Sequence, residues 1–231
     1  MKLAKNHIDI GIWTNTETSL PFWRDKIGLP YEELLKLGGG FHQHRLSLKG
    51  SVFKLNHARH PLPDAAPAGF RELMIAADQE KSGSLTDPDG NRVTLVPIGH
   101  LDIDHIGMRM ATSSVDEAMQ FYCDALGAVP LSASHCRWAT TVFQFVEEPG
   151  IQVPDVYRAS DTLRAPGYRY ITVQVYKVDS EHERLLQMGA TEGSPPTTLG
   201  TTARISFIRD PDGNHIEVSQ RASLTGDLKP G

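Results

Sequence analysis

Three histidines and a glutamate stand where their side chains could bind a metal or transfer a proton. His7 opens the apolar run HIDIGI, and His105 opens the similar run HIGMRM 98 residues later. His215 is followed two positions later by Glu217. Alternate residues of a strand face the same side, so the side chains of His215 and Glu217 would share one face. Imidazole and carboxylate groups are usual ligands of divalent metals and usual groups in acid–base catalysis.

A repeated pentapeptide indicates that these residues lie in a duplicated chain. DPDGN occurs at Asp87–Asn91 and again at Asp210–Asn214, each time before a short apolar run. Farther upstream, GFRELMIA begins at Gly69 and GYRYITVQ begins at Gly167, again 98 residues apart. A spacing that is kept over such a distance is typical of an internal repeat. DPDGN itself has the composition of a turn, because Asp, Asn and Gly accept the backbone angles that a turn requires.

The elements that would position these residues form two similar halves, residues 1–99 and 100–221, followed by a tail at 222–231. Each half is predicted to contain strands, a helix and a hairpin. The second half is the more complete one, since it alone carries the helical pattern at Val178–Ala190. The first half is therefore an abbreviated copy that has lost the helix of its second module.

Composition excludes several classes of function. The chain has 231 residues, 22% of them charged, and a formal net charge of −5, which argues against binding to nucleic acid. No apolar run is long enough to cross a membrane, and the N-terminus lacks the apolar segment of a signal peptide. Cys123 and Cys136 lack the spacing of a metal or redox motif, so we expect two reduced thiols and a cytoplasmic protein.

The order of the elements, a histidine on the first strand and DPDGN before an IEV strand together resemble the vicinal oxygen chelate superfamily. This group includes glyoxalase I, methylmalonyl-CoA epimerase, fosfomycin-resistance proteins and extradiol dioxygenases. The resemblance covers roughly residues 5–220. It implies an α+β fold of tandem βαβββ modules, in which two similar halves each form a curved β-sheet cup.

The resemblance also implies metal ligands on the first and last strands of paired modules. In the C-terminal half these positions are occupied by His105, Gln152, Tyr170 and Glu217, of which we take His105, Gln152 and Glu217 as the predicted ligands. The equivalent positions of the N-terminal half are occupied by His7, Lys54, Glu72 and Thr94. His7 and Glu72 are the weaker candidates there. An ion pair between Lys54 and Glu72 is the simplest arrangement, and it would leave that half without a metal.

The same resemblance suggests roles for residues that are not ligands. Tyr170 stands where the superfamily commonly has a histidine. Tyr170 and His215 are therefore candidates for the proton donor or the general base, and Tyr170 could stabilise a developing oxyanion. Trp138 and Gln174 are candidate contacts to substrate.

Three functions are consistent with these residues. The favoured one is a metal-dependent lyase or isomerase of glyoxalase or epimerase type, in which a divalent ion (Fe, Mn, Zn, Ni or Co) chelates adjacent oxygens of a small organic substrate. The second is an extradiol-type ring-cleavage dioxygenase, to which Tyr170 in place of a histidine is an objection. The third is a metal-free protein that binds a small molecule. The expected partners are that small molecule and a second copy of the chain in a homodimer, without nucleic acid or membrane.

Overall fold

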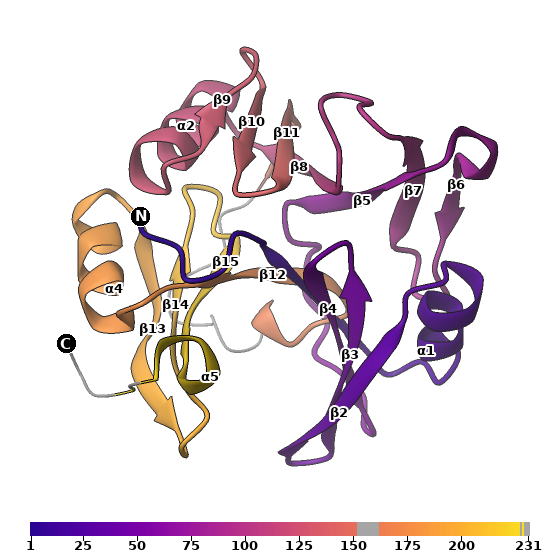
Figure 1. Ribbon diagram of the computed structural model, residues 1–231, viewed down its shortest axis with the longest axis horizontal. Helices are drawn as coiled ribbons and strands as arrows, with labels where there is room; N and C mark the ends of the chain where they lie inside the picture. The colour runs from indigo at the N-terminus through magenta and orange to yellow at the C-terminus, as the bar shows by residue number, and fades with distance from the viewer. Residues whose placement is uncertain (152–161, 227, 229–231) are drawn as a thin grey trace.

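The computed structural model describes residues 1–151, 162–226 and 228, which form two curved sheets with short helices on their outer sides (Figure 1). The chain is divided into four modules. The first contains β1 (Asp9–Thr14), α1 (Ser19–Pro21), η1 (Phe22–Lys26), β2 (Tyr31–Gly38), β3 (Phe41–Leu48) and β4 (Ser51–Ala58). The second contains β5 (Phe70–Ala77), the 3₁₀ turn η2 (Gln79–Lys81), β6 (Gly83–Thr86) and β7 (Arg92–Pro97).

The third and fourth modules have longer helical segments. The third contains β8 (Ile106–Thr112), α2 (Val115–Gln120), η3 (Phe121–Ala125), β9 (Val129–Pro130), β10 (His135–Trp138) and β11 (Thr141–Glu147). The fourth contains β12 (Gly167–Gln174), α4 (Val178–Gln187), β13 (Thr191–Leu199), β14 (Ala203–Arg209), β15 (His215–Arg221) and α5 (Ala222–Thr225). None of the helices in these described segments is long and apolar enough to span a membrane.

The predicted α+β fold of tandem modules that form two cups is confirmed. The expectation that each half of the chain forms its own cup is wrong, because each cup takes one module from each half. The eight-stranded sheet, in the order β13-β14-β15-β12-β1-β4-β3-β2, combines the first and fourth modules. The seven-stranded sheet, in the order β6-β7-β5-β8-β11-β10-β9, combines the second and third. A short connection, residues 98–105, keeps these two inner modules in one sheet, because consecutive elements joined by short links stay adjacent.

The strands have one apolar face and one polar face, and this alternation positions the candidate site. In β1, Ile10 and Ile12 belong to the hydrophobic core beneath the helices. Asp9 and Gly11 alternate with them and therefore face the concave side of the sheet. Asp9 is buried there and accepts hydrogen bonds from the Lys5 ammonium and from the backbone of Val52. The concave face of the eight-stranded sheet is consequently buried but polar.

The two DPDGN turns join the sheets to one another. Asp89, in the first turn, accepts hydrogen bonds from Thr14 (2.6 Å) and Ser19 (2.7 Å). Both belong to the first module, whose strands lie in the eight-stranded sheet. Asp212, in the second turn, accepts one from Thr112 (2.5 Å), at the end of β8. Each turn thus holds the start of a helical segment in the opposite sheet.

Candidate functional site

Polar side chains meet at the centre of the eight-stranded sheet, where the first strands of the outer modules lie side by side. Gly11 of β1 is paired with Lys54 of β4 and with Tyr170 of β12. Next to it, Thr172 of β12 is paired with Glu217 of β15. We call the concave face around Lys54, Thr172 and Glu217 the eight-stranded cup.

The ammonium of Lys54 is the central group of this cup. Its Nζ donates hydrogen bonds to Thr172 Oγ1 (2.7 Å) and to Glu217 Oε2 (2.9 Å). The hydroxyl of Thr172 donates to the same carboxylate oxygen at 2.8 Å. Lys54 is only 2% exposed, and a buried ammonium is tolerated when it is paired and hydrogen-bonded in this way. The charge of Glu217 is therefore neutralised by a lysine.

Tyr170 lies beside this ion pair, with its hydroxyl in a chain of hydrogen bonds. Its hydroxyl oxygen accepts a hydrogen bond from Asn56 Nδ2 (3.0 Å), and Asn56 Oδ1 accepts one from Gln43 (2.8 Å). Burial, and next the charge of Glu217, raise the pKa of Tyr170 well above its usual value, so the phenol keeps its proton. The ring lies against Gly11, where an added Cβ would come within 2.2 Å of it. Only glycine at that position leaves room for Tyr170.

His215 adds a neutral imidazole to the same face. It is the strand neighbour of Tyr170, and the ring of Phe207 lies 5.8 Å from Tyr170 and 6.2 Å from His215. Burial, and then the charges of Arg209 and Arg169, lower the pKa of His215 to about 4. The imidazole is therefore uncharged at neutral pH and is able to accept a proton.

The seven-stranded sheet has an equivalent centre with different residues. Here Arg109 of β8 is paired with Glu72 of β5 and with Gln144 of β11. Arg109 Nη1 lies 2.9 Å from Glu72 Oε2, and Arg109 Nε donates to Gln144 Oε1 at 3.0 Å. The hydroxyl of Thr94 donates to the other oxygen of Glu72. We call the concave face around Glu72, Arg109 and Gln144 the seven-stranded cup.

The residues at these centres do not fit a divalent metal. The structure does not bring His105 and Glu217 together, because His105 precedes β8 of the seven-stranded sheet and Glu217 lies on β15 of the other. Gln152 lies outside the described residues. Within residues 1–151, 162–226 and 228, no three His, Cys, Asp or Glu side chains are grouped so that they could hold a metal. In each cup the carboxylate faces a fixed cation, Lys54 or Arg109, which would repel a metal ion.

The two histidines that open the repeated runs meet between the sheets. The rings of His7 and His105 are 5.8 Å apart at an angle of 73°. His7 Nδ1 lies 2.8 Å from the hydroxyl of Thr140, and His105 Nδ1 lies 3.3 Å from the carbonyl oxygen of Lys49. His7 lies four positions before Gly11, and His105 lies four positions before Arg109. Both histidines therefore lie outside the paired strands and away from the cup centres. Their place is a junction between the two sheets.

The other predicted residues are found in three different settings. Trp138 packs in the core against Tyr122 and Phe143, at ring distances of 6.4 and 6.3 Å. Gln174 lies buried on β12, and its side-chain oxygen has no hydrogen-bond partner in the described part of the chain. Glu72 lies in the seven-stranded cup.

The expected ion pair between Lys54 and Glu72 does not form. Lys54 binds Glu217, and Glu72 binds Arg109. The expectation was wrong because the two side chains belong to different sheets. Sequence reading also missed Arg109 and Gln144 as centre residues. The signal that identifies them is the strand register, since they occupy the positions equivalent to Gly11 and Lys54.

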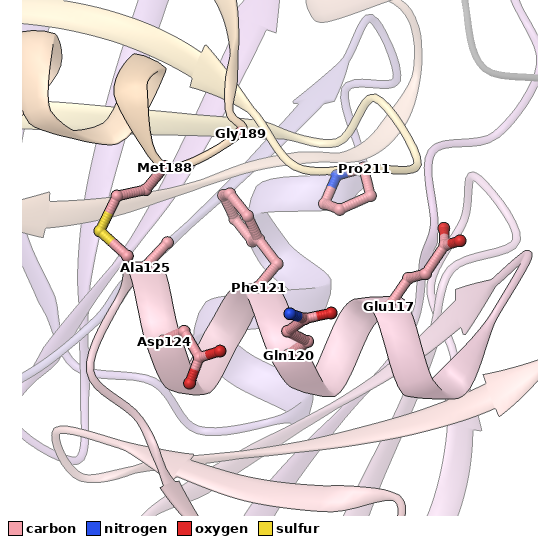
Figure 2. Close-up of a pocket in the computed structure, with 8 residues that line it drawn as sticks. All are labelled: Glu117, Gln120, Phe121, Asp124, Ala125, Met188, Gly189 and Pro211. Carbon is pink, nitrogen blue, oxygen red and sulfur yellow. The ribbon is translucent and has the colours of Figure 1, made fainter.

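A surface hollow lies outside both cups, between the α2–η3 segment and the end of α4 (Figure 2). Its volume is about 370 Å³. It is lined by Glu117, Gln120, Phe121, Asp124, Ala125, Met188, Gly189 and Pro211. Figure 2 shows Phe121 pointing from its helix toward Gly189 and Pro211. The lining has carboxylates but no cation to oppose them, so we place the candidate site in the eight-stranded cup, where charged groups are buried and in contact.

Comparisons with known proteins agree with this architecture. The family model described as Glyoxalase/Bleomycin resistance protein/Dioxygenase superfamily matches residues 102–218. A mutant of glyoxalase I from Zea mays is similar in structure, with a TM-score of 0.73 and 14% identity over 96% of this chain and 95% of that chain. A protein from Bacillus subtilis subsp. subtilis str. 168, provisionally named a dioxygenase, has a TM-score of 0.62 and 11% identity over 100% and 92%. No curated protein matches the chain in sequence. At these identities the structural likeness shows the fold alone.

Proposed function

Because this chain belongs to the glyoxalase/bleomycin resistance protein/dioxygenase superfamily, we propose that it binds a small organic molecule in the eight-stranded cup without a divalent metal. The observation that carries the proposal is the ammonium of Lys54, 2.9 Å from Glu217 Oε2. A protonated lysine has three donors and no lone pair, so it cannot ligate a metal. It fills the side of the carboxylate at which a metal would be bound.

The two hypotheses of a metal-dependent enzyme receive less support from the same residues. A lyase or isomerase of glyoxalase or epimerase type, and an extradiol-type dioxygenase, would each need about three neutral or anionic ligands around an open position. The eight-stranded cup offers one carboxylate, an ammonium and a protonated phenol. The seven-stranded cup offers one carboxylate beside a guanidinium. The metal-free alternative is the one that accounts for both cations.

The groups of the eight-stranded cup favour a ligand that accepts hydrogen bonds. Two of the three N–H groups of Lys54 are used by Thr172 and Glu217, which leaves one for a ligand. The phenol of Tyr170 accepts from Asn56 and keeps its own proton for donation. A carbonyl or carboxylate oxygen placed between these donors would accept a hydrogen bond from each of them.

A second candidate function is a metal-free lyase or isomerase, and His215 favours it. The neutral imidazole of His215 would accept a proton from a bound carbonyl compound. Lys54 and Tyr170 would hold the oxygen on which negative charge develops. In this second function His215 and Tyr170 would take the acid–base roles predicted from the sequence, and Lys54 would supply the cation.

Metal binding by the native protein and by two Lys54 variants tests the proposal. We expect the native melting temperature to be the same in EDTA and in Mn²⁺, Co²⁺, Ni²⁺ or Zn²⁺. Lys54→Glu places a second carboxylate beside Glu217, and a divalent ion should then raise its melting temperature by about 5 °C or more. Lys54→Gln is the matched control, since it removes the ammonium without adding a ligand. One equivalent of metal that resists dialysis in native protein, and whose removal lowers the melting temperature, would overturn the proposal.

The predicted homodimer stays a prediction. Each cup is complete within one chain, so a second copy is not required to assemble the candidate site. Sedimentation equilibrium of the native protein would measure the oligomeric state.

A further inference from the structure

We propose that the occupant of the eight-stranded cup is a small organic carboxylate, held by the guanidinium groups of Arg45 and Arg221. This inference rests on the proposed function, because it names the class of ligand for the same cup. It is carried by buried Arg45 and half-buried Arg221, which have buried guanidinium nitrogens without a hydrogen-bond partner in the described part of the chain.

Arg45 presents unused donors from β3. It is paired with Lys54 in the sheet, so both side chains lie on the concave face. Only 7% of Arg45 is exposed, yet its Nε and Nη1 atoms are buried without a hydrogen-bond partner. Its ion-pair partner is Glu33, whose side chain is 51% exposed and lies 3.4 Å from Nε. Buried donors that lack partners are rare, because each loses its hydration without a replacement.

Arg221 reaches the same space from the opposite side of the sheet. It ends β15 and alternates with Glu217 and Ser219, so it faces the concave side. Its Nε is buried without a hydrogen-bond partner, and no carboxylate of the described residues lies within ion-pair distance of it. Burial, and next the charge of Arg45, lower the pKa of Arg221 below its usual value. Two guanidinium groups from distant strands therefore lie on the same concave face, where the charge of Arg45 acts on Arg221.

The charges of the described cup do not balance. Lys54 is neutralised by Glu217, and Asp9 is neutralised by Lys5. Arg45 has only the half-exposed Glu33. Arg221 feels the charges of Glu217, Asp9 and Glu33, but no carboxylate of the described residues lies within ion-pair distance of it. A surplus positive charge at a half-buried place is costly unless an anion accompanies it.

The geometry of the donors selects the kind of anion. Arg45, Arg221, Lys54 and Tyr170 all offer hydrogens, so the ligand must offer acceptors. A guanidinium forms two parallel hydrogen bonds with a carboxylate, which makes this pairing strong and directional. The acidic hollow of Figure 2 has the opposite charge and would repel such a ligand. A carboxylate in the eight-stranded cup would satisfy the unused arginine donors and neutralise the surplus charge together.

Three pairs of probes test the ligand class: formate and formamide, acetate and acetamide, benzoate and benzamide. Each pair keeps its shape and differs in charge. Thermal shift and calorimetry at about 20 mM probe detect a Kd of about 1 mM. We expect at least one carboxylate to raise the melting temperature while its amide does not. Equal shifts by acid and amide, a shift with inorganic phosphate alone, or no shift with any carboxylate would overturn the inference.

Variants of Arg221 test whether it holds the carboxylate. Arg221→Gln should weaken the binding of the carboxylate that raises the melting temperature by about 10- to 100-fold, because a charge-assisted hydrogen bond is lost. Arg221→Lys keeps the charge but loses the two parallel N–H donors of the guanidinium. Its affinity should lie between those of Arg221→Gln and the native protein. The control Arg24→Gln removes an exposed arginine paired with Asp25 and should leave affinity unchanged. Native affinity in Arg221→Gln would overturn the assignment.

The outcome can be separated from that of the metal test. If no carboxylate binds while Lys54→Glu gains metal binding and the native protein does not, the metal-free cup stands and this inference fails. If the native protein retains a stabilising metal, the proposed function fails whatever the carboxylates do.

Discussion

The two cups are built from equivalent strands, but they place the cation and the carboxylate on different ones. In the eight-stranded cup both charges lie on the last strands of their modules, Lys54 on β4 and Glu217 on β15. In the seven-stranded cup both lie on the first strands, Arg109 on β8 and Glu72 on β5. The same fold therefore pairs a buried carboxylate with a cation in two different ways. In the described residues neither cup groups three possible metal ligands.

The cups also differ in what fills them, and the cause is the order of the modules. In the seven-stranded sheet, Ile103 packs with Met74 and Val142 in a small second core. Ile103 belongs to the short link between β7 and β8, which joins the two modules of that sheet. The modules of the eight-stranded sheet are not consecutive, so no short link joins them directly. Among the described residues, polar side chains occupy the centre of this cup.

Removing the cation from each cup should give the largest difference between them. Lys54→Met leaves Glu217 buried and unpaired, and should lower the free energy of unfolding by about 3–5 kcal/mol. Arg109→Met should cost about 1 kcal/mol, because the Arg109 side chain is 37% exposed and its removal opens the 7% exposed Glu72 to water. Urea unfolding followed by circular dichroism measures both. Adding Glu217→Gln to Lys54→Met should recover much of the loss, and a similar cost for both single variants would contradict the contrast in burial.

Acid should weaken the eight-stranded cup through His215. Because its pKa is lowered to about 4 in the folded state from an ordinary 6.5, the stability that it contributes is complete above pH 6.5 and is lost as pH falls toward 4. The loss should amount to about 3 kcal/mol. His215→Gln should remove this part of the pH dependence, measured as the difference between the variant and native unfolding curves. The equivalent position in the seven-stranded sheet is occupied by Arg92 and not by a histidine. Parallel pH curves for native protein and variant would show that His215 is not the group responsible.

The smallest expected contrast concerns one glycine in each cup. An added Cβ at Gly11 would lie 2.2 Å from the ring of Tyr170, whereas at Gly107 it would lie 2.5 Å from the end of the Ile103 side chain. A buried aromatic ring moves less easily than a terminal methyl group. Gly11→Ala should therefore cost about 2–3 kcal/mol and Gly107→Ala about 1 kcal/mol. Thermal denaturation of the two variants ranks them, and the reverse order would mean that Tyr170 is free to move.

Local features of this protein could be read from its sequence with good accuracy. The helical pattern at Val178–Ala190 corresponds to α4 at Val178–Gln187. The two DPDGN segments are turns, with Asp87 and Asp210 accepting hydrogen bonds from their own asparagines. These elements depend on periodicity and turn residues within a few positions of one another, so a single sequence contains the information.

The candidate site was harder to predict, because its residues are neighbours only across the sheet. His105 and Glu217 have the chemistry of metal ligands, and their modules are consecutive in the chain, but they lie in different sheets. Arg109 and Gln144 have ordinary places in apolar strands, and only the register of β8 with β5 and β11 shows that they are centre residues. A shift of a few residues along a strand decides which side chain reaches the cup.

By itself, the sequence determined the repeated modules, their turns and the alternation of polar and apolar faces, since these follow from local propensity and period. Only the tertiary structure decided that Lys54 would meet Glu217, 163 residues away. That contact depends on which modules share a sheet and on how their first strands align, and both are set by links and packing between distant segments. The ion pair of Lys54 with Glu217 is therefore a property of the folded chain.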